Sequence, residues 1–539
     1  MAQAHPDNMT DLFVLGGGIN GCGIARDAAG RGLSVTLAEM NDLASATSSA
    51  STKLFHGGLR YLEYLELRLV REALKEREVL LRAMPHISWP MRFVLPYHAG
   101  MRFEADTPTS RILGLAMPWM RGRRPGWLIR LGLGLYDGLA GRGTLPRTRT
   151  LSLPGTVEGA PLQDRFERAW EYSDCWVDDA RLVVLNARDA QDRGARILTR
   201  TRVLSAERDG DHWRIATRDA TGATETHRAR VLVNAGGPWV GEIIRGTIRM
   251  NSSDGVRLVR GSHIVTPKLY EHDKCYFFQG TDGRIIFAIP YEDDFTLIGT
   301  TDVEHDDPDT TPECTPAERD YLIDFANQYF RTPIGPDDVV RTYSGVRPLY
   351  DDGASNASAA TRDYTLKLET TGGAPVLNVF GGKITTYRRL AEHALEKLEP
   401  HLPGAGAAWT RGAPLPGGDF AVEAVAELIA GLQRDYPFLT DRWARRLIRA
   451  YGTEARTILD GARSAEDLGE DFGATLTGAE LDWLRTREFA RTAEDVIWRR
   501  SKLGLRMTEG EVAALDAHMA AHGEKADGDG AATRTVASG

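Results

Sequence analysis

The chain has 539 residues, a length that implies two or three domains. Its formal net charge of -9 argues against bulk binding of nucleic acid, and its four cysteines are scattered without a CxxC pair. We therefore expect neither a disulfide scaffold nor a metal site. Residues 1–11 are polar and predict no secretion signal, and no stretch reaches the ~18 apolar residues of a spanning helix. The protein is expected to be soluble or to lie on a membrane surface.

The first strand and helix of the chain enclose a glycine-rich turn. An apolar strand over 12–15 runs into Gly16-x-Gly18-x-x-Gly21, and a helix is predicted over 24–30. Glycines at this spacing permit a tight turn, close approach of the backbone to a pyrophosphate, and close packing of helix on strand. The N–H groups at the helix N-terminus would bind the phosphates.

A second predicted strand, 34–38, ends in Glu39, whose carboxylate would accept hydrogen bonds from ribose hydroxyls. The motif therefore indicates an adenine dinucleotide, and by itself leaves NAD and FAD open. The structural alternative is an ordinary strand-to-helix turn with Glu39 on the surface.

The next stretch combines small residues with a second glycine pair. Residues 44–52 are alanine, serine and threonine, which allow close packing against a flat ligand but are equally typical of a polar loop. His56 and Arg60 flank Gly57-Gly58, and an amphipathic helix is predicted from about 61 to 83.

Residues 107–136 invert the charge of the chain locally. This segment contains no acidic residue and five arginines, Arg111, Arg121, Arg123, Arg124 and Arg130. Its apolar residues, which lie between the arginines, include tryptophan, leucine and methionine. Such a mixture is typical of a segment that inserts apolar groups at a bilayer surface while its cations face anionic headgroups. The alternative is a buried helix preceded by a basic loop.

The remaining chain predicts a return to the first sheet, a second layer and a helical end. Strands expected in the first sheet are 196–198, 212–217, 227–234 and 376–380, with glycine turns at 234–239 and 381–383. Alternating patterns at 262–265, 284–290, 295–300 and 364–368 predict antiparallel strands of a substrate-covering layer. Residues 400–418 are rich in proline and glycine and predict a linker, 419–522 predict helices, and 523–539 predict a disordered tail.

Several cationic or imidazole groups stand beside these turns, namely His56, Arg60, His263, Arg347, Arg362 and Lys383. Converging arginine and lysine side chains would hold a phosphate or carboxylate, and a histidine would serve as general base for an alcohol proton. Each has a structural alternative: Arg347, which precedes a proline, would simply cap a strand end, and a single histidine is more often a satisfied structural group.

Long motifs resemble the flavin-linked respiratory sn-glycerol-3-phosphate dehydrogenases. They occupy 51–63, 172–182, 260–265, 298–302, 343–349, 361–365, 380–388, 467–473 and 495–500, so that the likeness extends over about residues 9–520. The resemblance implies an α/β fold with a Rossmann-like FAD-binding domain of the glutathione-reductase and D-amino-acid-oxidase type, an antiparallel β substrate domain and an all-α C-terminal cap domain.

The resemblance also implies where these parts lie. The oxidoreductase region is expected over 9–400, with FAD-binding segments at about 9–85, 170–245 and 340–400 and substrate-domain segments at about 86–169 and 246–339. The helical C-terminal domain is expected over 405–522. Glycine turns in three distant segments favour FAD, which stays bound, over NAD, which must come and go.

The family oxidises glycerol 3-phosphate to dihydroxyacetone phosphate and passes electrons to a membrane quinone. The resemblance implies that the substrate is held by Arg60, Tyr61, His263, Arg347, Arg362 and Lys383. Catalysis is assigned to His56, His263, Arg347 and Lys383; the general base is one of the two histidines, and we favour His263. FAD contacts are expected from Gly16, Gly18, Gly21, Glu39, Ser48, Ser49, Lys53, His56, Gly58, Val203, Gly236, Trp239, Gly345, Gly382 and Thr385.

We expect a cytoplasmic protein attached peripherally to the inner face of the cell membrane through residues 107–136. Compared with the family, 121–126 looks like an addition. The alternatives are a glycerol-3-phosphate oxidase that makes hydrogen peroxide, a related amine oxidase, and a non-catalytic flavin-binding protein of the membrane surface. The oligomeric state stays open, a homodimer included.

Overall fold

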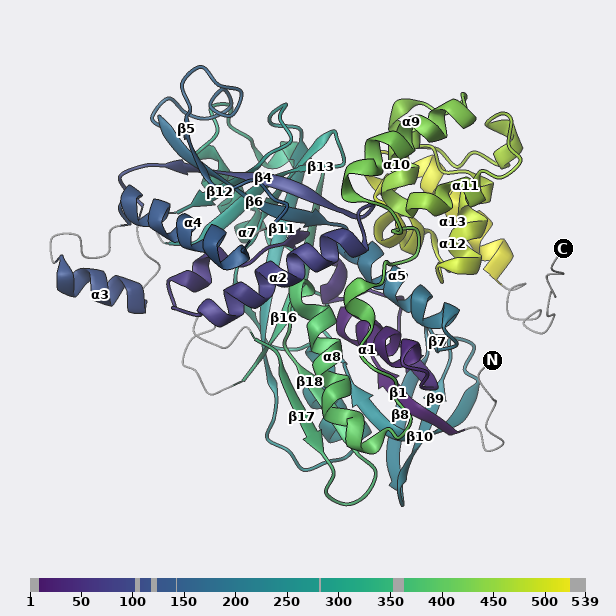
Figure 1. The fold of residues 1–539 in the computed structure, drawn as a ribbon. Coiled ribbons are helices and arrows are strands. Elements are labelled where there is room, and N and C mark those ends of the chain that lie inside the picture. The colour runs from purple at the N-terminus through teal and green to yellow at the C-terminus, as the bar shows by residue number, and fades with distance from the viewer. Residues whose placement is uncertain are drawn as a thin grey trace. The chain divides into compact units, whose positions relative to one another are not determined.

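The structure is a computed structural model that describes residues 9–101, 107–117, 124–141, 143–280, 283–351 and 363–523 (Figure 1). The chain divides into two compact units, Met1–Glu423 and Ala424–Gly539. This division falls later in the chain than residue 405, where the sequence analysis begins the helical domain. Residues 524–539 of the expected tail lie outside the described residues.

A mainly parallel sheet carries the first glycine turn. Its strands, in spatial order, are β17 (Thr365–Glu369), β18 (Val376–Phe380), β10 (Thr224–Asn234), β1 (Met9–Leu15), β2 (Val35–Ala38) and β7 (Arg196–Leu198), with β9 (His212–Arg218) and β8 (Arg202–Asp209) attached to β10 in turn. β10 pairs in parallel with both β1 and β18. The predicted return of the chain to its first sheet is therefore confirmed.

Residues 364–368 were predicted to form a strand of the second sheet, and this assignment was wrong. β17 pairs antiparallel with β18 in the first sheet, in a register that joins Thr365 to Phe380, and is not a strand of the second layer. A short turn containing Gly372 and Gly373, both with positive φ, links the two strands as a hairpin. Alternation indicates a half-covered strand, which is equally typical of either sheet, so the turn decides the pairing.

The second sheet is the expected antiparallel layer. Its strands, in spatial order, are β15 (Val303–His305), β11 (Val256–Pro267), β14 (Phe295–Gly299), β13 (Ile285–Tyr291), β12 (Cys275–Gln279), β4 (Ser88–Tyr97), β6 (Arg168–Val177) and β3 (Leu54–Phe55); β16 (Arg341–Tyr350) also pairs with β11, and β5 (Arg149–Ser152) with β6. The β4–β12 contact is parallel. One side packs on α7 (Pro316–Asn327) through a buried aromatic cluster that includes Tyr276, Phe278 and Tyr329.

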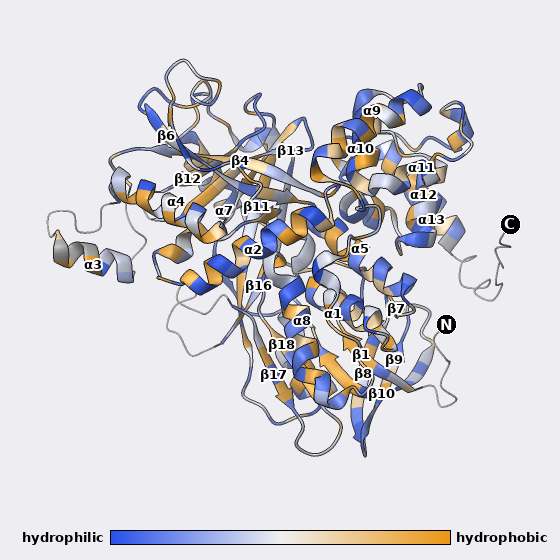
Figure 2. Cartoon of the chain, viewed as in Figure 1, coloured by the Kyte–Doolittle hydropathy of each residue, from blue (hydrophilic) through white to orange (hydrophobic). Residues whose placement is uncertain are grey.

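Helices α1 (Ile19–Gly30) and α8 (Tyr387–Leu398) lie side by side against the first sheet (Figure 1). Their approach is close: a Cβ on Gly23 would lie 2.8 Å from Cδ2 of Tyr387. α1 begins five residues earlier than predicted, because it starts directly after Gly18. Figure 2 shows the strands behind them as mainly hydrophobic, as expected of a sheet covered by helices.

The other helices of the first unit are α2 (Leu67–Ala83), α3 (Pro108–Ala116), α4 (Gly126–Ala140), α5 (Asp179–Asp192) and α6 (Val240–Glu242). α2 starts later than the predicted residue 61, because a 3-10 turn at Leu59–Leu62 and the positive φ of Leu65 precede it. The second unit contains α9 (Val425–Asp435), α10 (Asp441–Tyr451), α11 (Ala455–Ile458), α12 (Gly478–Arg487) and α13 (Glu509–Gly523). Among the described residues, no helix has the length and apolarity to span a bilayer.

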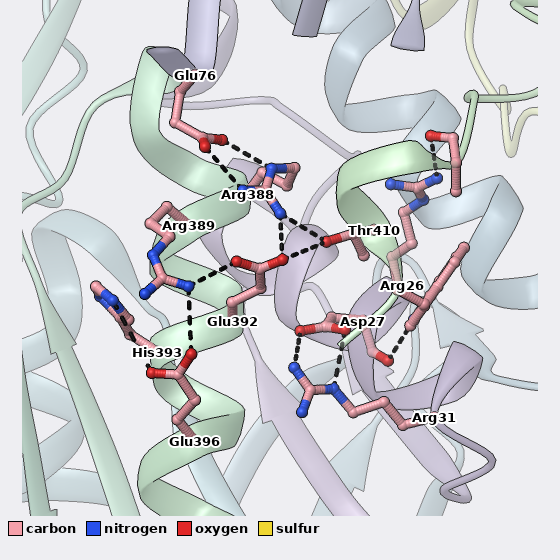
Figure 3. Close-up of polar contacts among 12 residues, drawn as sticks. Arg26, Asp27, Arg31, Glu76, Arg388, Arg389, Glu392, His393, Glu396 and Thr410 are labelled. Carbon is pink, nitrogen blue, oxygen red and sulfur yellow. Dashed lines mark hydrogen bonds and ion pairs between the residues drawn. The ribbon is translucent and has the colours of Figure 1, made fainter. Parts of the chain in front are cut away.

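Residues 400–418, expected to be a linker, pack against the first unit. Arg388 of α8 makes two 2.7 Å hydrogen bonds to Glu76 of α2 and donates to the hydroxyl of Thr410 at 3.1 Å (Figure 3). The Trp409 indole donates to the carbonyl of Asp27 at 3.1 Å, and the Arg193 guanidinium lies 3.9 Å from its ring centroid. These contacts hold the segment in one conformation, so the composition of proline and glycine does not mark a free linker here.

Candidate functional site

A cavity of about 670 Å³ extends through the first unit from the first glycine turn to Lys383. Most of the predicted site residues line it: Gly16, Gly18, Glu39, Ser48, His56, Gly58, Tyr61, Val203, Gly236, Trp239, His263, Gly345, Arg347, Gly382, Lys383 and Thr385. These residues come from chain segments that lie more than three hundred residues apart in sequence, so the fold gathers the three glycine turns around one space.

The three turns also contact one another directly. Gly16 has a φ of +107°, and a Cβ there would lie 2.4 Å from the carbonyl oxygen of Ala235 in the second turn. The Asn20 amide donates to the carbonyl of Gly381 in the third turn at 3.1 Å. Gly21 does not line the cavity; a Cβ there would lie 1.9 Å from the Gly16 carbonyl oxygen. Gly21 therefore permits the turn to close, as the third glycine of such motifs does.

Glu39 follows β2 at the cavity wall. Its carboxylate accepts hydrogen bonds from the backbone N–H groups of Gly17 at 2.6 Å and Asn41 at 2.8 Å. Burial raises the pKa of Glu39, while these two hydrogen bonds act in the opposite direction. A carboxylate has about four lone-pair positions, so acceptor capacity remains for a ribose.

The cavity has features that suit an adenine dinucleotide such as FAD. A Cβ on Gly18 would meet one atom, Oγ of Ser48 at 3.2 Å, so the backbone at the start of α1 is open toward the cavity. Within the described residues, two buried polar atoms beside it, Oδ1 of Asn20 and Nδ1 of His263, have no hydrogen-bond partner. Buried polar atoms are normally satisfied, and a bound ligand would satisfy these.

Two predicted cofactor residues lie behind the cavity wall. Lys53 is buried and has a φ of +59°; its ammonium pairs with Asp179 at 2.7 Å and donates to the carbonyl of Ser49 at 3.1 Å. Lys53 and Ser49 do not line the cavity. A lysine near a glycine turn suggests an anion ligand, but here a buried carboxylate already compensates its charge.

His263 is the most enclosed of the candidate catalytic groups. Its Nε2 lies 3.1 Å from the Thr52 hydroxyl, and its ring stacks on Tyr343 with 4.7 Å between centroids. A Cβ on Gly299 would lie 2.0 Å from its Cδ2, so the neighbouring strand leaves room for the ring only at a glycine. Burial holds the pKa of His263 well below its ordinary value of 6.5, reinforced by the charges of Arg347 and Lys53. The imidazole is therefore neutral at pH 7 and able to accept a proton.

Arg347 lies on β16, where Val259 of β11 pairs with it. Its guanidinium forms an ion pair with Asp302 and donates to the hydroxyl of Thr300 at 3.1 Å. These contacts orient the side chain at the cavity wall, and an arginine has five N–H donors, so donors remain for an anion.

Lys383 and Tyr61 contact each other at the cavity wall. The lysine ammonium lies 3.9 Å from the centroid of the Tyr61 ring. The His56 ring lies near Phe287, with 6.4 Å between centroids, and both residues line the cavity. Arg362 and the side chain of Arg60, which the sequence analysis adds to the substrate site, lie outside the described residues.

Thr52, Thr300 and Asp302 are not among the residues predicted for the site. All three line the cavity and contact either His263 or Arg347. A signal existed, because Thr300 and Asp302 lie within the motif at 298–302 and Thr52 within the run of small residues. Threonine and aspartate are common in loops, so only their contacts identify them.

The fold and the cavity define an FAD-type dinucleotide oxidoreductase, and comparison with known proteins agrees. Residues 11–388 match the family model of FAD-dependent oxidoreductases, and residues 408–529 match the C-terminal domain of alpha-glycerophosphate oxidase. The chain therefore belongs to the FAD-dependent oxidoreductase family, and both the predicted cofactor, FAD, and the predicted fold class are confirmed.

Individual relatives cover nearly the whole chain. D-erythritol 1-phosphate dehydrogenase of Brucella abortus is 52% identical over 95% of this chain and 98% of its own. Aerobic glycerol-3-phosphate dehydrogenase of Escherichia coli is 48% identical over 92% of this chain and 94% of its own. The structure of the glycerol-3-phosphate dehydrogenase of Bacillus halodurans complexed with FAD matches with a TM-score of 0.70 and 25% identity, over 98% of this chain and 97% of that one. The resemblance to the glycerol-3-phosphate dehydrogenases is confirmed.

Proposed function

We propose that the protein is an FAD-dependent dehydrogenase that oxidises glycerol 3-phosphate to dihydroxyacetone phosphate. The observation that carries the proposal is that Arg347, Lys383 and His263 line the same cavity as the three glycine turns. An arginine suits a phosphate monoester, a second cation suits the charge that develops on the oxidised oxygen, and a buried neutral imidazole suits an alcohol proton. The names of the relatives at 47% and 48% identity support this substrate.

In the proposed mechanism, FAD supplies the hydride acceptor. Arg347, oriented by Asp302 and Thr300, binds the substrate phosphate by charge-assisted hydrogen bonds. His263 takes the proton of the C2 hydroxyl on a ring nitrogen, and Thr52 and Tyr343 fix the ring for this step. Lys383 stabilises the negative charge that develops on the substrate oxygen.

A four-carbon substrate is the second candidate. The relative with 52% identity is named for D-erythritol 1-phosphate, which carries the same phosphate and secondary alcohol with one more carbon. The chemistry at His263 and Arg347 would be unchanged, so the two candidates differ in the length that the cavity accepts. Comparing kcat/KM for the two phosphates decides between them.

We further propose that the electrons pass to a quinone at the cytoplasmic face of the membrane. The helices of the predicted surface segment support this proposal. α3 and α4 expose large apolar side chains, including Leu115, which is 83% exposed, with Ile112, Trp127, Leu131 and Leu135. Residues 118–123, which include Arg121 and Arg123, lie outside the described residues. Exposed apolar groups beside arginines are typical of helices at a bilayer surface. The relatives cited here are named as dehydrogenases, which argues against the oxidase.

The proposed reaction predicts a colour change. The purified protein should be yellow. Anaerobic addition of glycerol 3-phosphate without NAD should reduce the flavin and thereby bleach its absorbance at about 450 nm. Erythritol 1-phosphate, glycerol and glycine serve as comparison substrates. A flavin that none of the phosphates bleaches would contradict the proposed function, and rapid reoxidation by oxygen with quinone inert would favour the oxidase.

The proposed surface segment predicts binding to anionic vesicles. Changing Leu131 and Leu135 to glutamate should weaken sedimentation with phosphatidylglycerol vesicles by roughly 100-fold or more, because each leucine loses about 1.5–3 kcal/mol of burial in lipid. Leucine and glutamate have similar helix propensities, so α4 should persist. The control is Val157→Glu, which adds a charge at another exposed apolar residue. Equal sedimentation of the double variant and the control would contradict the proposal.

A further inference from the structure

Helix α4 has two faces with different surroundings. Trp127, Leu131 and Leu135 are exposed on one face, whereas Leu133 and Tyr136 are fully buried on the other. A buried tyrosine keeps a polar end that needs a partner. The partner of Tyr136 is not on its own helix, but in the turn whose residues His56 and Gly58 line the cavity.

The Tyr136 hydroxyl joins this wall to a buried ion pair. It accepts a hydrogen bond from the backbone N–H of Gly57 at 2.7 Å and lies 2.9 Å from both carboxylate oxygens of Asp174. Asp174 in turn forms an ion pair of 2.6 Å with Arg77 of α2. Burial, reinforced by the charge of Asp174, raises the pKa of Tyr136 well above its ordinary value of 10.0, so the hydroxyl keeps the proton that it donates to Asp174.

Burial of the Asp174–Arg77 ion pair also affects the protonation of Asp174. Burial raises the pKa of Asp174 to about 6, although Arg77 and Tyr136 act in the opposite direction. At neutral pH the carboxylate is charged and accepts from both partners. Removing the tyrosine hydroxyl would take away the acceptor that lies 2.7 Å from the buried Gly57 N–H, which would then depend on its interaction with the Asp174 carboxylate. Losing a buried hydrogen bond costs more than losing an exposed one.

Gly57 lies between two residues that line the cavity, His56 and Gly58. A Cβ on Gly57 would lie 2.6 Å from Cδ2 of Leu74 and 2.7 Å from the Tyr136 hydroxyl oxygen, so the turn packs tightly on α2 and α4. The same segment is attached again at Glu63: its carbonyl accepts from the hydroxyl of Thr109 at the start of α3 at 2.8 Å, and its carboxylate pairs with Arg124. The turn from His56 to Glu63 is therefore held from the side of the exposed helices.

We infer that Tyr136, supported by Asp174, is a positioning residue for catalysis: its hydroxyl holds the turn that brings His56 and Gly58 to the wall of the cavity. Tyr136 does not line the cavity, and it acts through the Gly57 amide. This inference rests on the proposed function for its kinetic part, whereas the hydrogen bond that carries it is independent of the substrate.

The test is Tyr136→Phe in the full-length protein with FAD bound. The ring keeps its packing, so FAD content should stay at the wild-type value. We expect kcat per bound flavin to fall by roughly tenfold with KM within about twofold, because the turn is displaced whereas Arg347, which binds the phosphate in the proposed mechanism, is not. Hydrogen exchange of the peptide over 54–60 should become about tenfold faster, because the Gly57 amide loses the hydroxyl that accepts from it at 2.7 Å.

Two controls separate this role from general destabilisation. Tyr270→Phe removes a buried hydroxyl that donates to the Ala288 carbonyl at 2.7 Å, and Leu133→Ala opens space under the same face of α4. Both should leave kcat per bound flavin near wild type, even where they lower stability. A Tyr136→Phe protein with wild-type kcat per flavin, or with unchanged exchange over 54–60, would overturn the inference. If neither polyol phosphate bleaches the wild-type flavin, the proposed function fails while the exchange measurement still decides whether Tyr136 holds the turn.

Discussion

Replacing His263 with glutamine is expected to lower the rate of flavin bleaching by glycerol 3-phosphate by about 10²–10⁴-fold, the usual effect of removing a general base. Glutamine is polar and of similar length, so it should fit between Tyr343 and Gly299 and leave FAD content unchanged. The measurement is the anaerobic bleaching rate at saturating substrate, which reports the chemical step without the electron acceptor.

The comparison that matters is His56→Gln. Both histidines line the cavity, and the ring of His263 is enclosed, stacks on Tyr343 and lies 3.1 Å from the Thr52 hydroxyl. The control is His305→Gln, which changes a buried histidine on β15 that does not line the cavity. If His56→Gln costs much more than His263→Gln, the roles of the two histidines are reversed.

The same histidine predicts a pH dependence. Because burial, Arg347 and Lys53 hold the pKa of His263 well below 6.5, the acid limb of kcat/KM due to this group should lie well below pH 6.5. Stability follows the same sign: as pH falls below 6.5, the unfolded chain binds a proton at this position that the folded chain does not bind, so the free energy of unfolding decreases. The glutamine variant should lack this contribution.

Replacing Arg347 with alanine is expected to lower kcat/KM by about 10³-fold or more, because a charge-assisted contact to the phosphate is lost and Asp302 is left without its partner. FAD content should stay near wild type, because Arg347 belongs to none of the three glycine turns and the substitution leaves the backbone of β16 in place. Arg347→Lys should recover only part of the loss, since a lysine cannot reproduce the planar fork of the guanidinium.

The matched control is Arg257→Ala. Arg257 lies on β11, pairs with Leu349 of β16 close to Arg347, and forms an ion pair with Glu304, but it does not line the cavity. The alanine variant should therefore keep kcat/KM within about twofold, as for other surface ion pairs. An Arg347→Ala protein with the kinetics of this control would remove Arg347 from the substrate site.

Much of the fold was predictable from local chemistry. The spacing of Gly16, Gly18 and Gly21 after an apolar strand requires a strand-to-helix turn, because only glycine accepts a φ of +107° or a carbonyl within 2 Å of its Cβ position. The later glycine turns follow buried strands for the same reason. These turn patterns consist of a few residues that are adjacent or nearly adjacent in the sequence. The sequence alone is therefore enough to predict the turns.

Other features depend on contacts between distant residues. Lys53 is a cation close to a glycine turn, as expected of an anion ligand. Its partner, however, is Asp179, which lies 126 residues later in the chain and behind the cavity wall. Residues 400–418 have the composition of a linker, yet Trp409 is held by α1 and Arg193. The role of Tyr136 depends on Gly57 and Asp174, which no helical periodicity connects to it. Contacts between residues that are so far apart in the sequence can be identified only in the three-dimensional structure.

The wide spread of the cavity along the chain also has a consequence for biosynthesis. Its wall is formed by residues from Gly16 to Thr385, and β18, which follows most of these residues in the chain, pairs with β10 in the first sheet. On the ribosome, the cofactor cannot be captured in its complete site until about seven-tenths of the polypeptide has emerged. We expect that the supply of flavin during expression therefore sets the yield of the first unit, because a ligand that binds only the native state stabilises it by mass action.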